Sequence, residues 1–382
     1  METKKYRFDE VTINFDKKRI PLSSAQREKR QGTFRYYGAQ GVIDHVDDYI
    51  YDGTYLLIAE DGENLKSKKQ NIAQVVDGQF WVNNHAHIVQ GNEQSDTRFL
   101  CYLINSMDLS GYVTGSAQPK LSQANLNAIT LSLPTLVEQK RIVEYLYMLD
   151  QKIDVNRQIN DNLQQQAAAL FESWFVNYDP WDGVQPSEWE NAPLGSFVEI
   201  KRGGSPRPIQ DFLSDSGLRW LKISDVTSLS SPFVLEIKEH IKEEGLRKTV
   251  FLHAGELVLS NSATPGIPKI LDVDTCIHDG WLYFPKSELS KYYLYLFFKH
   301  IRKELVALGN GSVFTNLKTD ILKAFPATKA DESTLKEFDA LVTPLFDAML
   351  NADRENFKLA AMRDALLPKL MSSEIDVSEV EL

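Results

Sequence analysis

The chain has 382 residues, of which 43% are hydrophobic and 25% are charged, and its formal net charge is −11. This length predicts two or three domains, and the composition is that of an ordinary globular protein. No apolar run is long enough to span a bilayer, and the only cysteines, Cys101 and Cys276, form no CxxC pair, which argues against a membrane protein, a zinc site and a disulfide framework. We therefore expect a cytoplasmic protein.

Residues 1–130 form the first predicted globular segment, which is built from strands and turns. Strands are predicted at 54–59 and 79–82, because apolar residues follow an Asp-Gly turn at both places. A short helix is predicted at 98–106. These elements together predict a mixed α/β domain.

A long helix is predicted within 131–178, because 137–175 contain neither glycine nor proline. A continuous helix of about 39 residues extends roughly 58 Å. Pro180 ends the helix, and 179–193 form a linker that contains three prolines. The first domain is thus predicted to be followed by a rod.

A second globular segment is predicted at 194–325, followed by a second long helix within 326–372 and an acidic tail at 373–382. Pro344 lies near the start of this helix and predicts that it is shortened or kinked. The order of a globular segment and a long helix therefore occurs twice in the chain.

The two halves are related by an internal repeat. Residues 115–175 return at 311–371 with a constant offset of 196, the difference between the equivalent Leu121 and Leu317. Apolar residues at alternate spacings of four and three in both helices are typical of a coiled coil. We expect an α+β fold in which two globular mixed α/β domains are separated by two long antiparallel helices around a pseudo-twofold axis. The polar seam residues predicted to fix the helix register are Asn156, Asn160 and Asn356.

The negative charge is concentrated in 131–191 and 319–382, whereas the globular segments are close to neutral and carry local basic runs. Net charge therefore does not exclude binding to nucleic acid. In the first segment the candidate contacts are basic, amide, imidazole and aromatic side chains, for which solvated surface or structural hydrogen bonding is the alternative. They are Arg27, Lys29, Arg30, Arg35, Tyr36, Lys66, Lys68, Lys69, Asn83, Asn84 and His85.

The second segment carries its candidate contacts in three groups. Cations flank a Gly-Gly turn that permits close approach of a phosphate, and two further groups supply short polar side chains. The residues are Lys201, Arg202, Ser205 and Arg207; Lys222, Ser224 and Asp225; and Ser260, Asn261, Ser262 and Thr264. No metal site is expected, because the alternating His85 and His87 have no third ligand nearby in sequence.

Several segments in this order carry a resemblance to a known family. They are Tyr36-Tyr-Gly-Ala-Gln-Gly-Val-Ile-Asp, Trp81-Val-Asn-Asn-His-Ala-His, Leu170-Phe-Glu-Ser-Trp-Phe-Val, Gly203-Gly-Ser-Pro and Arg363-Asp-Ala-Leu-Leu-Pro-Lys-Leu-Met. Over essentially its whole length the chain resembles a specificity subunit of a type I restriction–modification system. The resemblance implies two target recognition domains, 1–130 and 194–325, that each read one half of a bipartite DNA sequence, with the helices as the spacer between them.

The same resemblance implies partners. Double-stranded DNA, two modification (methyltransferase) subunits and, through these, restriction subunits would bind to the chain. It would itself be non-catalytic, and S-adenosylmethionine, ATP and magnesium would belong to the partner subunits.

Two other functions are compatible with the residues. A scaffold could join proteins through its coiled coil and ignore DNA. A magnesium-dependent nuclease could use Asp225 with Glu236 and Lys238, although Glu-x-Lys triples are common. DNA that stays uncut when mixed with the purified chain and magnesium would argue against the nuclease.

Overall fold

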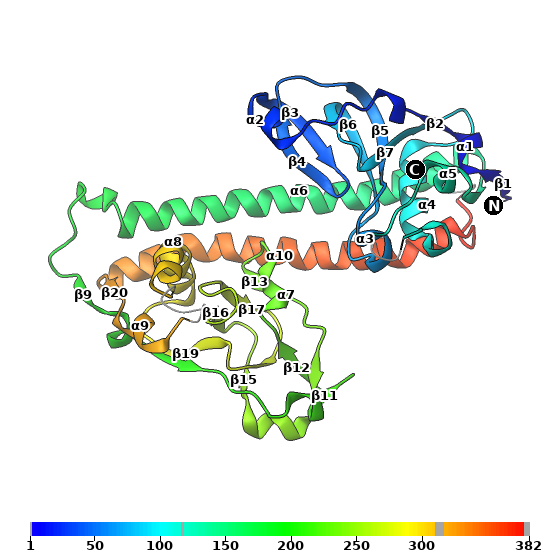
Figure 1. Cartoon of the computed structure of the whole chain (residues 1–382). Helices are drawn as coiled ribbons and strands as arrows, with labels where there is room; N and C mark the ends of the chain where they lie inside the picture. The colour runs from blue at the N-terminus through cyan, green and yellow to red at the C-terminus, as the bar shows by residue number, and fades with distance from the viewer. Residues whose placement is uncertain (1, 116–117, 310–316, 378–382) are drawn as a thin grey trace. The chain divides into compact units, whose positions relative to one another are not determined.

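The computed structural model describes residues 2–115, 118–309 and 317–377. The chain divides into two compact units, Met1–Gln151 with Leu359–Leu382, and Lys152–Lys358. Both long helices, α6 (Leu136–Phe175) and α10 (Glu332–Met371), contribute a part to each unit; Figure 1 shows α6 in green and α10 in orange to red. The start of the second repeat copy, 311–316, lies outside the described residues.

The first unit is built on a six-stranded sheet in the order β2-β7-β5-β6-β3-β4 (Figure 1). Its strands are β2 (Thr12–Asn14), β3 (Gln31–Gly38), β4 (Gly41–Val46), β5 (Tyr51–Ala59), β6 (Ala73–Val82) and β7 (Ala86–Gly91). The pair β3·β6 is parallel, and the other pairs are antiparallel. The strands predicted at 54–59 and 79–82 are confirmed as parts of β5 and β6.

Both faces of this sheet are covered along β5, because its side chains alternate between two apolar clusters. Leu56 and Ile58 pack in the cluster that holds the helices, whereas Tyr55 and Leu57 pack in the cluster on the other face. The helix predicted at 98–106 is confirmed as α4 (Thr97–Ser106), whose Asp96 side chain caps its first turn.

Shorter elements complete the first unit. They are β1 (Lys4–Arg7), which pairs with β8 (Thr130–Leu133), α1 (Phe8–Val11), η1 (Asp16–Lys18), α2 (Ser24–Glu28), α3 (Asn64–Ser67), η2 (Ser110–Tyr112) and α5 (Gln123–Asn127). Ile142 and Leu146 of α6 share an apolar cluster with Leu370 of α10. Asp150 and Arg363 form an ion pair of 2.8 Å across these two helix segments.

The second unit contains two five-stranded sheets, in the orders β10-β19-β16-β17-β13 and β11-β14-β12-β18-β15. Their strands are β10 (Val198–Arg202), β11 (Leu213–Ser214), β12 (Leu218–Leu221), β13 (Phe233–Val234), β14 (His240–Ile241), β15 (Val250–Leu252), β16 (Leu257–Ser260), β17 (Pro268–Leu271), β18 (Thr275–Ile277) and β19 (Trp281–Ser287). The pair β12·β18 is parallel, as β3·β6 is in the first unit.

The remaining elements of the second unit surround these sheets. They are η3 (Asp179–Trp181), β9 (Glu190–Pro193), η4 (Leu194–Ser196), η5 (Ile209–Asp211), α7 (Ser224–Thr227), η6 (Glu243–Lys248), α8 (Lys291–Gly309), α9 (Thr319–Ala324) and β20 (Pro326–Lys329). Aromatic residues of α6, α8 and α10 form much of the core, among them Phe171, Phe298 and Phe346. Residues 326–329 pair with β9, so the second long helix begins only at Glu332.

Within the second unit the two long helices run antiparallel and are joined by buried asparagines. Asn156 Nδ2 donates to Glu355 Oε2 (2.7 Å) and to Asn356 Oδ1 (2.9 Å). Asn160 Nδ2 donates to Asp353 Oδ1 (2.8 Å). As the residue number rises along α6, the number of the partner on α10 falls, which is the antiparallel order that the repeat predicts.

The prediction that Pro344 shortens the second helix is wrong, because α10 continues through it to Met371. Pro344 is exposed, whereas Val342, Phe346 and Met349 are fully buried on the packed side of the same helix. A proline removes one backbone hydrogen bond, and this loss is tolerated where water can reach the freed carbonyl.

No helix in the described part of the chain is long and apolar enough to cross a bilayer.

Candidate nucleic-acid interface

In each unit the carboxyl ends of two parallel strands form an edge that gathers predicted contacts; the further parallel pair of the second unit, β13·β17, lies in its other sheet. The carboxyl ends of β3 and β6 meet at the pair Tyr37 and Val82, and those of β12 and β18 meet at Leu221 and Ile277. Ligands commonly bind at the carboxyl ends of parallel strands. The turn after the second strand of each pair, 83–85 or 278–280, therefore defines what we call the first edge and the second edge.

The turn of the first edge presents two exposed polar residues. Asn84 and His85 are exposed, whereas Asn83 is buried and its Oδ1 accepts the amide of His85 at 2.8 Å. The imidazole Nδ1 of His85 lies 2.8 Å from Asp61 Oδ2. Of the three residues predicted here, Asn84 and His85 are thus available to a ligand, and Asn83 shapes the turn.

An arginine that the sequence analysis missed bonds to the main chain of this turn. Arg19 Nη1 donates to the carbonyl oxygen of Ala86 (2.9 Å) and more weakly to that of Asn84 (3.4 Å). The same nitrogen forms an ion pair of 2.8 Å with Glu60. Arg19 thereby fixes the main chain on which Asn84 and His85 are carried.

His87 is part of the same cluster and is buried, with 1% of its side chain exposed. Its Nδ1 lies 2.6 Å from Asp16 Oδ2, and its Nε2 lies 2.8 Å from the carbonyl oxygen of Leu121. Both ring nitrogens thus lie within hydrogen-bond distance of an oxygen atom, which fixes the orientation of the buried ring. Burial alone would raise the pKa of Asp16, but hydrogen bonds from His87 and from the Ile88 amide outweigh this effect and lower it.

The predicted cations at 27–35 are tied to the protein rather than to the first edge. Arg27 forms an ion pair of 2.8 Å with Asp44, and Arg30 one of 2.8 Å with Asp47. Arg35 donates to the carbonyl oxygen of Asp77 at 2.6 Å. Three aromatic rings lie under these guanidinium groups at 4.9 to 5.6 Å, those of Tyr36, Trp81 and Tyr37. Exposed Lys29 has no hydrogen-bond or ion-pair partner within the described ranges.

Tyr36 corrects the prediction. It was expected to contact DNA, but its side chain is fully buried and its hydroxyl oxygen accepts the amide of Leu22 at 2.9 Å. The strand β3 has apolar clusters on both faces, with Tyr36 in one and Tyr37 in the other. The aromatic residues between the cations are therefore core rather than surface.

The predicted lysines 66–69 lie in and after α3. Lys66 donates to the carbonyl oxygen of Gly115 (3.0 Å), and Lys68 to that of Met107 (3.1 Å) and to Asp108 (3.2 Å). Lys69 is exposed. These contacts place Lys66 and Lys68 along the 107–115 segment instead of at the turn 83–85.

At the second edge, three predicted residues bond to one aspartate, Asp279. Arg202 donates to the carbonyl oxygen of Asp279, Ser205 Oγ donates to its Oδ1 (2.6 Å), and Arg207 pairs with its Oδ2 (3.0 Å). The hydrogen bond from Ser205 and the charges of both arginines lower the pKa of Asp279, although burial opposes them. Lys201 lies apart from this cluster and pairs with Glu199 at 2.9 Å.

A cavity of about 620 Å³ opens beside the same turn. Its lining includes Ser205, Arg207, Gln210, Trp220, Lys222 and His278. Lys222 forms an ion pair with Glu239, and its backbone amide donates to Asp225 Oδ2 at 2.9 Å. Asp225 thus ties the first turn of α7 to the residues just before it, and Ser224 is exposed.

The predicted group at 260–264 is only partly accessible. Ser260 is fully buried, donates to the carbonyl oxygen of Thr264 (2.6 Å) and accepts the amide of Ile267 (2.9 Å). Its predicted DNA contact is wrong, because this hydroxyl closes an internal turn. Asn261 is also buried, but its backbone N–H donates to the carbonyl oxygen of Gly280 and joins the segment to the second edge. Ser262 and Thr264 are half-buried.

Sequence analysis therefore missed four residues that shape the edges: Arg19, Trp220, His278 and Asp279. The dipeptide Asp279-Gly280, which follows an apolar strand, is a turn signal that marks the second edge. Arg19 bonds locally to Asp16, but its partners at the edge, Glu60 and Ala86, are more than forty positions away, so no local pattern marks its role there.

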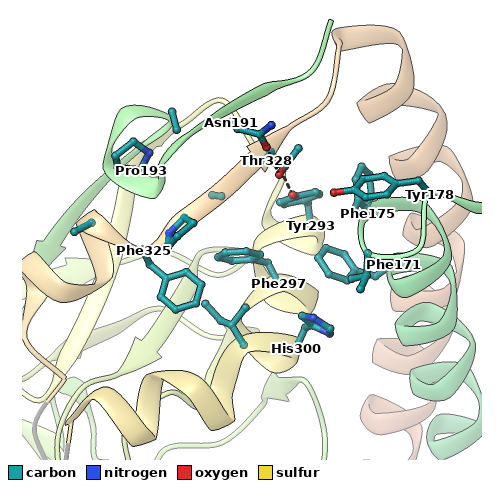
Figure 2. Close-up of a pocket in the computed structure, with 16 residues that line it drawn as sticks. Phe171, Phe175, Tyr178, Asn191, Pro193, Tyr293, Phe297, His300, Phe325 and Thr328 are labelled. Atoms are coloured by element: carbon teal, nitrogen blue, oxygen red, sulfur yellow. Dashed lines mark hydrogen bonds between the residues drawn. The ribbon is translucent and has the colours of Figure 1, made fainter. Parts of the chain in front are cut away.

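A second cavity of the second unit, of about 510 Å³, has a different character (Figure 2). Aromatic side chains dominate its lining, among them Phe171, Phe175, Phe297 and Phe325. Tyr293 turns its hydroxyl to the carbonyl oxygen of Thr328 at 2.7 Å. This apolar cavity contains none of the predicted contacts and is not a site for an anionic polymer.

Comparisons with known proteins agree with this architecture. The model of the type I restriction modification DNA specificity domain matches residues 2–165 and 186–328. A putative type I restriction enzyme specificity subunit of Haemophilus influenzae is 26% identical over 366 residues, which cover 92% of this chain and 89% of that protein. The MjaIX specificity subunit of Methanocaldococcus jannaschii is 24% identical over 307 residues, covering 74% and 70%.

A solved structure shares the fold. The crystal structure of the type I restriction–modification S subunit from M. genitalium matches with a TM-score of 0.66 at 14% identity, covering 97% of this chain and 96% of that one.

Proposed function

The chain belongs to the type I restriction–modification specificity family, whose role is DNA recognition, and from this premise we propose that its two edges are the surfaces that read DNA. The first edge would read one half of a bipartite target and the second edge the other half. The observation that carries this proposal is the similarity of the edges: each lies at the carboxyl ends of a parallel strand pair in an otherwise antiparallel sheet, and each gathers predicted contacts.

The chemistry of both edges suits the major groove. Asn84 and His85 at the first edge are an amide and an imidazole, groups that bond to base edges. The second edge carries Arg207 and Lys222. Arginine and lysine are the residue types that most often bond to guanine and to phosphates. Lys29 and Lys69, exposed elsewhere on the first unit, suit phosphate contacts that position the protein.

The helix pair would act as the spacer between the half-sites. Asn156 and Asn160 are buried in its seam and bond across to α10, and a buried polar residue at such a position admits one register. Asn356, the repeat equivalent of Asn160, accepts one of these bonds. We further propose that the chain is non-catalytic and acts in the cytoplasm. Two modification subunits and, through them, restriction subunits would supply the S-adenosylmethionine, ATP and magnesium chemistry.

A domain exchange tests the proposal. Residues 1–130 are replaced with the corresponding segment of another specificity subunit, and cells that carry the cognate modification subunit are analysed by methylome sequencing. We expect one half-site of the methylated motif to change, while the other half-site and the spacer remain. A motif that does not depend on the exchanged segment would overturn the proposal and favour a scaffold that ignores DNA sequence.

A further inference from the structure

The imidazole of His278 is held in one orientation at the mouth of the second-edge cavity. Its Nδ1 accepts the backbone amide of Gly280 at 2.8 Å. The rings of Trp220 and Trp281 lie 5.9 Å and 6.4 Å from it. A Cβ on residue 280 would lie only 2.3 Å from His278 Cε1, so the glycine is what allows this close approach.

This orientation also fixes the position of the ring hydrogen. Because Nδ1 is an acceptor, a neutral ring carries its hydrogen on Nε2. Burial lowers the pKa of His278, and the charges of Arg202 and Lys222 act in the same direction against the opposing effect of Asp279. The ring is therefore neutral near pH 7, with a donor at Nε2. This donor has no acceptor among the residues that the structure describes, and the ring lines the cavity.

The neighbouring polar groups of the cavity are donors as well. Arg207 has five N–H groups and Lys222 has three, and the carboxylates Asp279 and Glu239 occupy only some of them. Gln210 adds an amide that can donate or accept, and Pro206, Pro208 and Ile209 supply apolar surface. The charged groups and His278 therefore favour a ligand with two adjacent acceptors.

We propose that the second-edge cavity reads a guanine of the second half-site and that the Nε2–H of His278 donates to its O6/N7 edge. In the major groove guanine presents two adjacent acceptors, whereas adenine, cytosine and thymine present a donor, or a single acceptor beside a methyl group. Cations bonded to O6 and N7 are the commonest specific contact to a base. The inference rests on the proposed DNA-reading function and names the base and the residue that selects it.

The first test compares methylated motifs in cells that carry the modification subunit with wild-type chain or a variant. His278→Phe keeps a ring but removes both nitrogens, and His278→Gln keeps an amide donor. We expect the preference for guanine at one position of the second half-site to fall about tenfold with His278→Phe, and less with His278→Gln. The first half-site should be unchanged. The control His253→Phe alters an exposed histidine of the same unit and should leave the motif as it is.

Uniform loss of methylation at all sites without a change of motif, or an unchanged motif, would overturn the assignment, since it would indicate a phosphate contact or packing alone. A wild-type chain that gives no bipartite motif would instead overturn the proposed function itself.

A second measurement does not depend on the folding of a variant. The wild-type complex is titrated with duplexes in which 7-deazaguanine, which lacks the N7 acceptor, replaces the guanine of the second half-site. We expect binding about tenfold weaker than with the same replacement in the unread spacer. Equal affinity for the two duplexes would contradict the assignment.

Discussion

The two edges have a similar main-chain arrangement, but different surroundings support their turns. In the first unit the turn 83–85 lies over a buried charge cluster of Asp16, Arg19, Glu60 and His87. In the second unit the turn 278–280 lies beside an open cavity. In both units an arginine donates to a carbonyl oxygen of the turn or of the residue that follows it. A fixed backbone position can thus be supported by unlike side chains, which lets one fold carry two different readers.

The difference also concerns one buried basic residue of each unit. In the first unit His87 lies 2.6 Å from the carboxylate of Asp16. In the second unit the ammonium of Lys269, 3% exposed, is bonded only to the carbonyl oxygens of Leu229 and Ser231 in the described contacts. A cation held by carbonyl dipoles alone is easier to neutralise than one held by a charge.

The largest effect on stability is expected from removing the carboxylate that lies beside each turn. Asp16→Ala removes a buried carboxylate that bonds to His87, to the Ile88 amide and to Arg19, and it should destabilise the first unit by about 3–5 kcal/mol. Asp279→Ala frees cations that water can reach and should cost about 1 kcal/mol or less. Chemical denaturation, with hydrogen exchange of β7 and β19 as the local probe, measures both effects. Equal losses of stability would show that the two carboxylates do not differ in their contribution.

A smaller effect is expected from pH. Burial, together with the charges of Lys299 and Arg302, lowers the pKa of Lys269 to about 7 from its ordinary 10.5. Between these values the unfolded chain holds a proton that the folded chain lacks, so stability should rise as pH increases from 7 to 10.5. The slope should approach about 1.4 kcal/mol per pH unit, with no contribution from this group below pH 7.

The replacement Lys269→Met should remove this rise and leave the pH dependence of the first unit as it is. Urea denaturation at a series of pH values, with hydrogen exchange of β17 as a local probe, checks the expectation. A wild-type second unit whose stability is flat between pH 7 and 10.5 would refute it.

The smallest effect is expected from the arginines that hold the turns. Arg19→Met should weaken binding through the first half-site about tenfold, and Arg202→Met should do the same for the second, because each turn loses charge-assisted hydrogen bonds. Competition with duplexes mutated in one half-site separates the two effects. Arg157→Met, on an exposed face of α6, is the matched control and should change neither. A variant that weakens binding through both half-sites equally would contradict the assignment of each arginine to its own edge.

The long helices could be predicted closely from the sequence, because their signals are local. Neither glycine nor proline occurs in 137–175, and α6 spans Leu136–Phe175. Of the predicted seam asparagines, Asn156 and Asn160 are buried and Asn356 is half-buried. Only the effect of Pro344 was misjudged, because burial of the opposite helix face outweighs one lost hydrogen bond.

The edges could be predicted only in part, because they depend on contacts between distant segments. Ser205 and Asp279 are 74 positions apart, and nothing near either residue predicts their hydrogen bond. Tyr36 was misplaced for a different reason. It directly follows Arg35, so it resembles a surface aromatic, yet apolar clusters cover both faces of β3. Polarity identified the exposed cations, but the sheet order decided which of them lie at an edge.

The two prolines of α10 have a consequence for how the chain assembles. Pro344 and Pro368 lie inside this helix, whereas α6 has none. Each interior proline disfavours a free helix by about 3 kcal/mol relative to alanine, so an isolated α10 peptide should be largely a random coil in water. Because α10 is synthesised after α6 and after the strands of the second unit, it must acquire its shape by docking onto structure that already exists, which makes its formation a cooperative step of biogenesis.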